Sequence, residues 1–287
     1  MKHEDYPALY QAASLLSENA QRHFYRAFLF HMLLLALASA ISVANSTSPE
    51  LAILQALVLL GAFGCAIYLY LGRPDRHWYS GRAVAESIKT STWRFISRAE
   101  PFNNVDEIDY HNFGLKLKAI VEQNREVASL FTTHLDGLPI SSEMGRLRQS
   151  SDSERLNNYR KFRIIDQQNW YAKKARFNQR MVNSYFIALL FTLIVAITLS
   201  IARVRYTTIA YWPTDFFVTV AAGILSWIQA KRFQELSASY ALTAHEISLI
   251  RQQSGIAMTA NELSKFVGDA ENAFSREHTQ WIARRDQ

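Results

Sequence analysis

The strongest constraint on this fold is the pairing of long apolar segments that carry almost no charge. Between residues 27 and 72 the only Asp, Glu, Lys or Arg is Glu50, although 20% of the 287-residue chain is charged. Between residues 182 and 230 there are three such residues, Arg203, Arg205 and Asp215. A helix needs about 20 largely apolar residues to cross the hydrocarbon core of a bilayer. The sequence therefore predicts a membrane protein with polar parts outside the membrane.

Four membrane-spanning helices are predicted, arranged as two hairpins. They are expected at about residues 27–44, 51–71, 182–202 and 212–230. The polar, turn-forming connector from Asn45 to Glu50 joins the first pair. Before the last span, Tyr211 and Trp212 are typical of a membrane interface and Pro213 of a helix start. No strand pattern is convincing, so the expected fold class is an all-α polytopic membrane protein with amphipathic cytoplasmic helices.

Basic residues near the ends of the spans predict the orientation, because Lys and Arg accumulate on the cytoplasmic side. The connector 45–50 has none, whereas the outer flanks of the two hairpins carry Arg22, Arg26, Arg73, Arg76, Arg82, Lys173, Lys174, Arg176, Arg180, Lys231 and Arg232. Arg203 and Arg205 oppose this pattern but are outnumbered. Both termini are therefore expected in the cytoplasm.

A cleaved signal peptide is the alternative interpretation of the first span. Residues 28–38 fit its apolar core, and Ala38-Ser39-Ala40 has the small-residue spacing of a cleavage site. The preceding segment is long and carries Glu4, Asp5 and Glu18, and a second apolar span follows at once. These two features favour a retained helix.

Several functional classes find no support in the residues. Cys65 is the only cysteine, which excludes an internal disulfide or a four-thiolate metal site, and no phosphate-loop or dinucleotide motif occurs. His245-Glu246 does not extend to a zincin motif because Leu249 stands where the second His is required. Trp93 and Trp170 lie among basic residues, but helical spacing favours core packing over nucleic-acid binding. We expect no catalytic residues, no metal, no cofactor and no nucleic-acid partner.

The chain shows weak signs of internal duplication. Residues 17–26 precede the first hairpin as residues 172–181 precede the second, and residues 81–89 correspond loosely to 241–249, with Glu86 matching Glu246. Duplication is favoured over coincidence, so we expect one unit at 1–150 and another at 151–287.

Helical patterns follow each hairpin. Gly72-Arg73-Pro74 predicts a break after the second span. In the second half, one helix is expected to continue from the fourth span through Lys231 to about Gln253, with Gly255 ending it. A last helix at about 259–285 has an apolar face.

Three stretches resemble the SLATT family of two-span effector domains, which is named for its association with nucleotide-synthase and nucleotide-sensor proteins in bacterial conflict systems. The stretches are WYSGRAVAESIKTSTWRFISRAEPF (78–102), ERLNNYRKFRIIDQQNWYAKKARFNQ (154–179), and SYALTAHEISLI with FVGDAENAFSREHTQWIARR (239–250 and 266–285). The resemblance implies an all-helical protein of the bacterial inner membrane that forms pores or perturbs the bilayer. Its trigger would be a nucleotide or related signal sensed by a partner.

Polar residues on the predicted spans are the pore-lining candidates. They are Asp215, Thr219, Ser226, Gln229, Ser42 and Thr192. Ionisable groups at membrane depth are functional candidates by default, but small and hydroxylated residues also let helices pack closely. Helix packing is the favoured interpretation of these polar residues. Asp215 also fits a helix cap, but it is the residue most indicative of a pore.

Charged and aromatic residues outside the spans are candidates for coupling a signal to the membrane. They are Arg82, Glu86, Arg163, Asp166, Trp170, Glu246, Arg276 and Glu277. Salt bridges between helices explain them better than a reaction centre does. The basic excess in residues 73–181 is compatible with anionic lipid headgroups or a phosphate-bearing ligand, although the ordinary positive-inside bias is the simpler explanation.

The leading hypothesis is a homo-oligomeric membrane effector that permeabilises the bilayer after a signal from a nucleotide sensor or synthase. The alternative is a membrane-anchored scaffold or sensor whose cytoplasmic helices bind a partner protein without pore formation. A membrane enzyme is the third reading, and it lacks a supporting constellation of residues.

Overall fold

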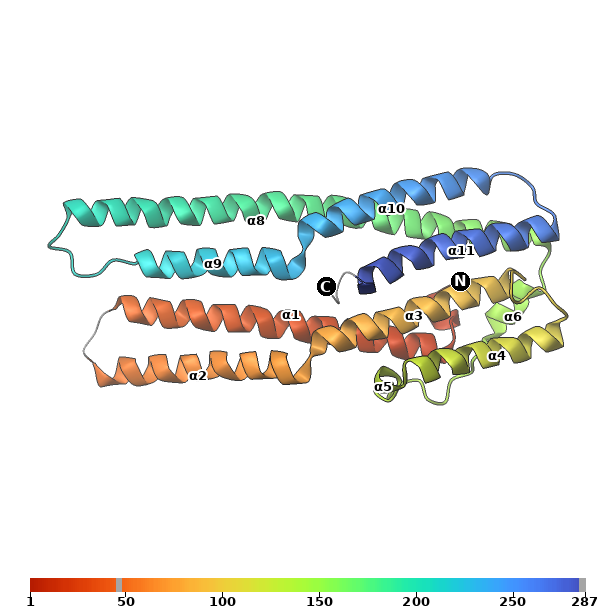
Figure 1. Cartoon of the computed structure of the whole chain (residues 1–287), viewed down its shortest axis with the longest axis horizontal. Coiled ribbons are helices and arrows are strands. Elements are labelled where there is room, and N and C mark those ends of the chain that lie inside the picture. The colour runs from red at the N-terminus through yellow and green to blue at the C-terminus, as the bar shows by residue number, and fades with distance from the viewer. Residues whose placement is uncertain (45–47, 284–287) are drawn as a thin grey trace. The chain divides into compact units, whose positions relative to one another are not determined.

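The structure, a computed structural model, describes the backbone of residues 1–44 and 48–283 and the side chains up to Ser275 (Figure 1). Over this part of the chain every regular element is a helix, which confirms the all-helical prediction. Residues 45–47 of the first hairpin connector lie outside the described residues.

The helices follow one another along the chain, and the longest connection between two described helices is residues 129–141. They are η1 (His3–Asp5), α1 (Ala8–Val43), α2 (Pro49–Gly72), α3 (Pro74–Ile96), α4 (Asp106–Gln123), α5 (Arg125–Ala128), α6 (Ser142–Arg148), α7 (Asp152–Tyr159), η2 (Arg160–Ile165), α8 (Asp166–Arg205), α9 (Thr214–Lys231), α10 (Phe233–Gln253) and α11 (Ala260–Ala283). The segment η2 is a single stretch of π-helix between α7 and α8.

The chain forms two compact units, and each draws on both halves of the sequence. The hairpin unit comprises residues 22–74 and 173–241. The core unit comprises residues 1–21, 75–172 and 242–287. Helices α1 and α8 continue from the core unit into the hairpin unit without interruption. The units at 1–150 and 151–287 expected from the sequence remain a prediction.

Three helical segments of the described chain are long and apolar enough to cross a membrane. They are Ala8–Val43, Pro49–Ile96 and Asp152–Arg205. In their most apolar windows only 6–11% of the residues are buried within the chain. Large apolar side chains such as Leu60, Phe63 and Phe191 are therefore exposed on the hairpin unit, as expected of surfaces that face lipid or another chain.

Polar and aromatic contacts hold the hairpin unit together. Between α1 and α2, the Nδ1 atom of His31 lies 2.9 Å from the carbonyl oxygen of Ala62, and the Gln55 amide donates to the carbonyl of Ala38 at 3.2 Å. Between α1 and α9, the rings of Tyr25 and Trp227 meet at 5.8 Å. Helix α1 is thus in direct contact with both α2 and α9.

The two hairpins end in matching backbone breaks. Arg73 after α2 and Arg232 after α9 both adopt left-handed conformations, with φ of 38° and 50°. The break at Gly72-Arg73-Pro74 confirms the sequence prediction. The expectation of one helix through Lys231 to Gln253 is wrong, because the backbone turns at Arg232 and the buried ring of Phe233 then stacks on Tyr185 at 5.4 Å.

The core unit has a densely aromatic interior. Trp93 is fully buried on α3, where its ring meets Tyr159 at 5.7 Å and its Nε1 atom donates to the hydroxyl of Tyr6 at 2.9 Å. Phe95, also on α3, packs against Phe113 of α4 at 4.6 Å. Helix α3 is thus held by contacts with Tyr6 near the start of the chain, with α4 and with the end of α7.

Candidate functional site

A pocket in the core unit brings together four of the predicted coupling residues. Arg82 and Glu86 reach it from α3, and Asp166 and Trp170 from α8. The pocket has a volume of about 300 Å³. Its other lining residues are Tyr10, Ser14, Ser17, Glu18, Gln21, Trp78, Ala85, Lys89, Gln167 and Tyr171. We refer to it as the α1–α3–α8 pocket.

Aromatic rings and charges of both signs line this pocket. The Arg82 guanidinium lies over the ring of Trp170, 5.7 Å from its centroid, which is a cation–π arrangement. Tyr171 meets Trp170 edge-on at 4.9 Å. Burial lowers the pKa of the Lys89 ammonium, and Glu86 opposes this effect. Burial also raises the pKa of Tyr10 to about 12, so its hydroxyl remains protonated at neutral pH.

The local sequence explains how the pocket residues converge. Arg82, Glu86 and Lys89 follow one another at spacings of four and three residues, so they lie along one face of α3. On α8, Asp166 and Trp170 are again four residues apart, and the π-helical segment η2 directly precedes them. A π-helical turn contains an additional residue and so changes which face the following helix presents; such turns are frequent at functional sites.

A second cluster lies fully inside the core unit, around Arg163. Its Nε and Nη2 atoms donate to the two carboxylate oxygens of Glu271 on α11, each at 2.8 Å. Tyr159 and Thr90 donate to the same carboxylate at 2.9 Å. The Arg163 and Glu271 side chains are 1% and 0% exposed, so this is a buried and multiply bonded ion pair. Burial raises the pKa of Tyr159, which remains a neutral donor.

A third buried charge, Arg148, was not anticipated from the sequence. It donates to Asp109 at 2.6 Å, to Asp106 at 2.9 Å and to the carbonyl oxygen of Phe102 at 3.1 Å. Its guanidinium also stacks over Phe95, 4.6 Å from the ring centroid. These contacts tie α3, α4 and α6 together, so Arg148 has a structural role.

The described side chain of Glu246 does not line the pocket. Glu246 is exposed on α10. Arg276 and Glu277 belong to α11, but their side chains lie outside the described residues.

Comparison with protein-family models matches nearly the whole chain in two consecutive parts. Residues 7–156 match SMODS and SLOG-associating 2TM effector domain 3, and residues 159–281 match SMODS and SLOG-associating 2TM effector domain 1. The chain belongs to the SLATT family. It carries two SLATT domains in tandem, as the sequence resemblance predicted. No curated protein and no solved structure matches the chain.

The α1–α3–α8 pocket and the buried cluster around Arg163 each contain residues from both SLATT matches. In the α1–α3–α8 pocket, Arg82, Glu86 and Lys89 belong to the first match, whereas Asp166 and Trp170 belong to the second. In the buried cluster, Thr90 comes from the first match, while Tyr159, Arg163 and Glu271 come from the second. Neither SLATT domain completes the core unit without the other.

The pore-lining candidates of the SLATT hairpins lie in different surroundings. Thr192 is buried and donates to the carbonyl of Ala188 in its own helix at 2.8 Å. Thr219 of α9 lies 3.1 Å from the hydroxyl oxygen of Ser39 on α1. Both therefore take part in packing within the chain. Ser226 is half-buried, whereas Asp215, Gln229 and Ser42 are exposed. A pore-lining role for these residues remains a prediction.

Lys89 and Glu271 are among the site residues that sequence reasoning missed. Glu271 carried a usable signal, because it lies on the same helical face as Val267 and Phe274, both of which are buried. A carboxylate on an apolar face predicts a buried cationic partner. Lys89 had a weaker signal, its spacing from Glu86 on α3.

Proposed function

We propose that the protein is a membrane effector of a bacterial conflict system that permeabilises the inner membrane when its core unit receives a signal. The family association with bacterial conflict systems and the apolar helices support this assignment. In this proposal α9 forms a fourth span, both termini are cytoplasmic, and several copies assemble in the bilayer. No catalysis is involved.

One observation carries the proposal: the α1–α3–α8 pocket is lined by helices that lead into the apolar segments. Helices α1 and α8 contribute Tyr10, Glu18 and Trp170 to the pocket and then continue unbroken to Val43 and Arg205. A ligand or partner that binds the pocket thus contacts the same helices that enter the membrane. The partner proposed from the family association is a nucleotide-signal sensor or synthase.

The exposed polar residues of α9 are compatible with an assembled pore. Asp215 has the only acidic side chain among residues 182–230, and it is exposed on the described chain. A carboxylate near one end of a pore attracts cations and repels anions, as rings of acidic side chains do in cation channels. Asp215 is therefore the residue on which we base the test.

The test is inducible expression in bacterial cells while membrane potential and entry of an impermeant dye are recorded. We expect depolarisation to precede growth arrest, and we expect Asp215→Asn to change the depolarisation or its ion dependence. Asp136→Asn is the matched control, because it removes the same charge from an exposed loop residue of the core unit.

Two results would contradict the proposal. One is growth arrest at full membrane potential when the protein is correctly inserted and expressed with its partner. That result favours a membrane-anchored scaffold. The other is an identical response of the Asp215 and Asp136 variants, which would exclude Asp215 from a pore.

A further inference from the structure

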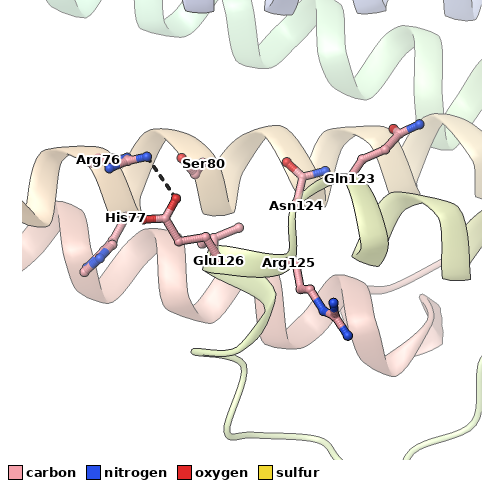
Figure 2. Close-up of a pocket in the computed structure, with 8 residues that line it drawn as sticks. Arg76, His77, Ser80, Gln123, Asn124, Arg125 and Glu126 are labelled. Carbon is pink, nitrogen blue, oxygen red and sulfur yellow. Dashed lines mark hydrogen bonds and ion pairs between the residues drawn. The ribbon is translucent and has the colours of Figure 1, made fainter.

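A second, smaller pocket of the core unit lies where the start of α3 meets the junction of α4 and α5. Arg76, His77 and Ser80 line it from α3, and residues 123–127 line it from the other side. Its volume is about 160 Å³, which suits a group of a few heavy atoms. Figure 2 shows Arg76 and Ser80 beside the carboxylate of Glu126, while Arg125 extends away from α3.

The lining of this pocket is rich in hydrogen-bond donors. Arg76 brings positive charge to the side of Glu126, and the neutral side chains of Ser80, Gln123 and Asn124 add a hydroxyl and two amides, whereas the Arg125 guanidinium extends away from α3. Glu126 is the only carboxylate among the lining residues. Arginine guanidinium groups match the oxygens of phosphate in both charge and geometry.

Glu126 occupies the position that an anion would take. Its carboxylate accepts a hydrogen bond from the Arg76 Nη2 atom at 2.9 Å. The side chain of Glu126 is 79% exposed and that of Arg76 is 46% exposed, so this is a surface ion pair. Such pairs contribute little to stability. An incoming anion can therefore replace Glu126 at Arg76 without disturbing the core of the unit.

The chain connection keeps this pocket near the membrane. Arg76 follows Gly72, the last residue of α2, by four residues. Four residues of chain reach at most about 14 Å. The basic side of the pocket thus stays within headgroup distance of the end of an apolar helix, where anionic lipids attract Lys and Arg.

We propose that this pocket binds a phosphate group, with Arg76 as its principal ligand and Glu126 as the internal competitor that occupies Arg76 when phosphate is absent. The phosphate comes from an anionic phospholipid headgroup or from a free phosphate ester; the chemistry at Arg76 is the same. This site is separate from the α1–α3–α8 pocket, and the proposal holds whether or not the protein opens a pore.

The experiment uses the full chain in nanodiscs of phosphatidylcholine alone or with phosphatidylglycerol or phosphatidic acid, and bound lipid is counted by native mass spectrometry. A second arm adds inorganic phosphate to the phosphatidylcholine nanodiscs and measures the shift in thermal unfolding. Retention of anionic lipid without a thermal shift from inorganic phosphate assigns the phosphate to the lipid headgroup. A rise in the unfolding temperature with inorganic phosphate assigns it to a soluble ligand. The absence of both bound anionic lipid and a thermal shift overturns the proposal.

Two variants with opposite expected effects make the test specific. Arg76→Gln should weaken phosphate or lipid binding by about tenfold, because one charge-assisted hydrogen bond is lost. Glu126→Gln should strengthen binding, because the competing carboxylate is removed. Lys116→Gln is the charge-matched control on the exposed face of α4, and it should change binding less than twofold.

The control also defines the outcomes that would overturn the proposal. Equal losses in the Arg76 and Lys116 variants would show general attraction to positive charge rather than a site. Weaker binding in the Glu126 variant would show that this carboxylate does not compete. All three side chains are exposed, so circular dichroism should show unchanged helix content and a binding change cannot be attributed to misfolding.

Discussion

At the scale of single residues, the least replaceable groups are the charges sealed inside the core unit. Arg163 and Glu271 are joined by two hydrogen bonds, and Tyr159 and Thr90 also donate to the carboxylate. Removing one member of such a pair leaves an uncompensated buried charge, which costs far more than the pair contributes. The ion pair of Arg146 and Glu143 is open to solvent, so a charge left without its partner there is hydrated by water.

We predict that Glu271→Gln lowers the free energy of unfolding by about 3–5 kcal/mol. Glu143→Gln, which breaks the exposed pair with Arg146, should cost about 0–1 kcal/mol. Thermal unfolding of the purified proteins in the same detergent checks both. Similar losses in the two variants would show that the Arg163 site is hydrated.

The double variant Arg163→Met with Glu271→Leu refines this prediction. It removes both charges, so it should be more stable than Glu271→Gln alone, although Tyr159 and Thr90 then lose an acceptor. A double variant less stable than the single one would place the loss in these neutral hydrogen bonds instead.

At the scale of elements, helix ends were predicted correctly where Gly and Pro mark them in the sequence. The break before α3 was predictable because Gly72 and Pro74 flank Arg73. The equivalent break at Arg232 has neither residue beside it and depends on the packing of Phe233, which one sequence does not reveal. The same applies to Arg148, whose acidic partners Asp106 and Asp109 on α4 are about 40 residues away in the sequence.

The proposed membrane crossing of α9 can be tested directly. Its 18 residues extend about 27 Å, close to the thickness of the hydrocarbon core. In a Cys65→Ser background, Thr208→Cys before α9 and Gln252→Cys at the end of α10 are both exposed positions. If α9 spans the bilayer, an impermeant maleimide should label position 208 but not position 252 in intact cells.

Permeabilised cells provide the control for this labelling, because both positions should then react. Equal labelling of the two positions in intact cells would mean that α9 does not cross the membrane. Labelling of position 252 alone would reverse the orientation expected from the basic residues.

At the scale of the whole molecule, the tandem SLATT domains are interdependent. The sequence predicts two consecutive units, and the two family matches also follow one another along the chain. The compact units of the structure are divided differently, since the core unit takes Thr90 from the first domain and Glu271 from the second. A linear sequence cannot show this exchange, because it arises from long-range contacts formed on folding.

We therefore predict that neither SLATT domain is stable alone. Fragments 1–156 and 159–287 should be degraded when expressed separately and should copurify when expressed together. Glu271→Gln in the second fragment should reduce the copurified amount. A fragment that alone gives a soluble, cooperatively unfolding species in detergent would contradict this prediction.

The four helices of the two hairpins differ in how their backbone continues beyond the apolar segment. Helices α1 and α8 keep their backbone hydrogen bonds from the pocket into the apolar segments, whereas α2 and α9 are each interrupted by one left-handed residue, Arg73 or Arg232. Each hairpin thus pairs one helix of continuous backbone with one whose backbone changes direction at a single left-handed residue, a conformation that disfavours any residue with a side chain.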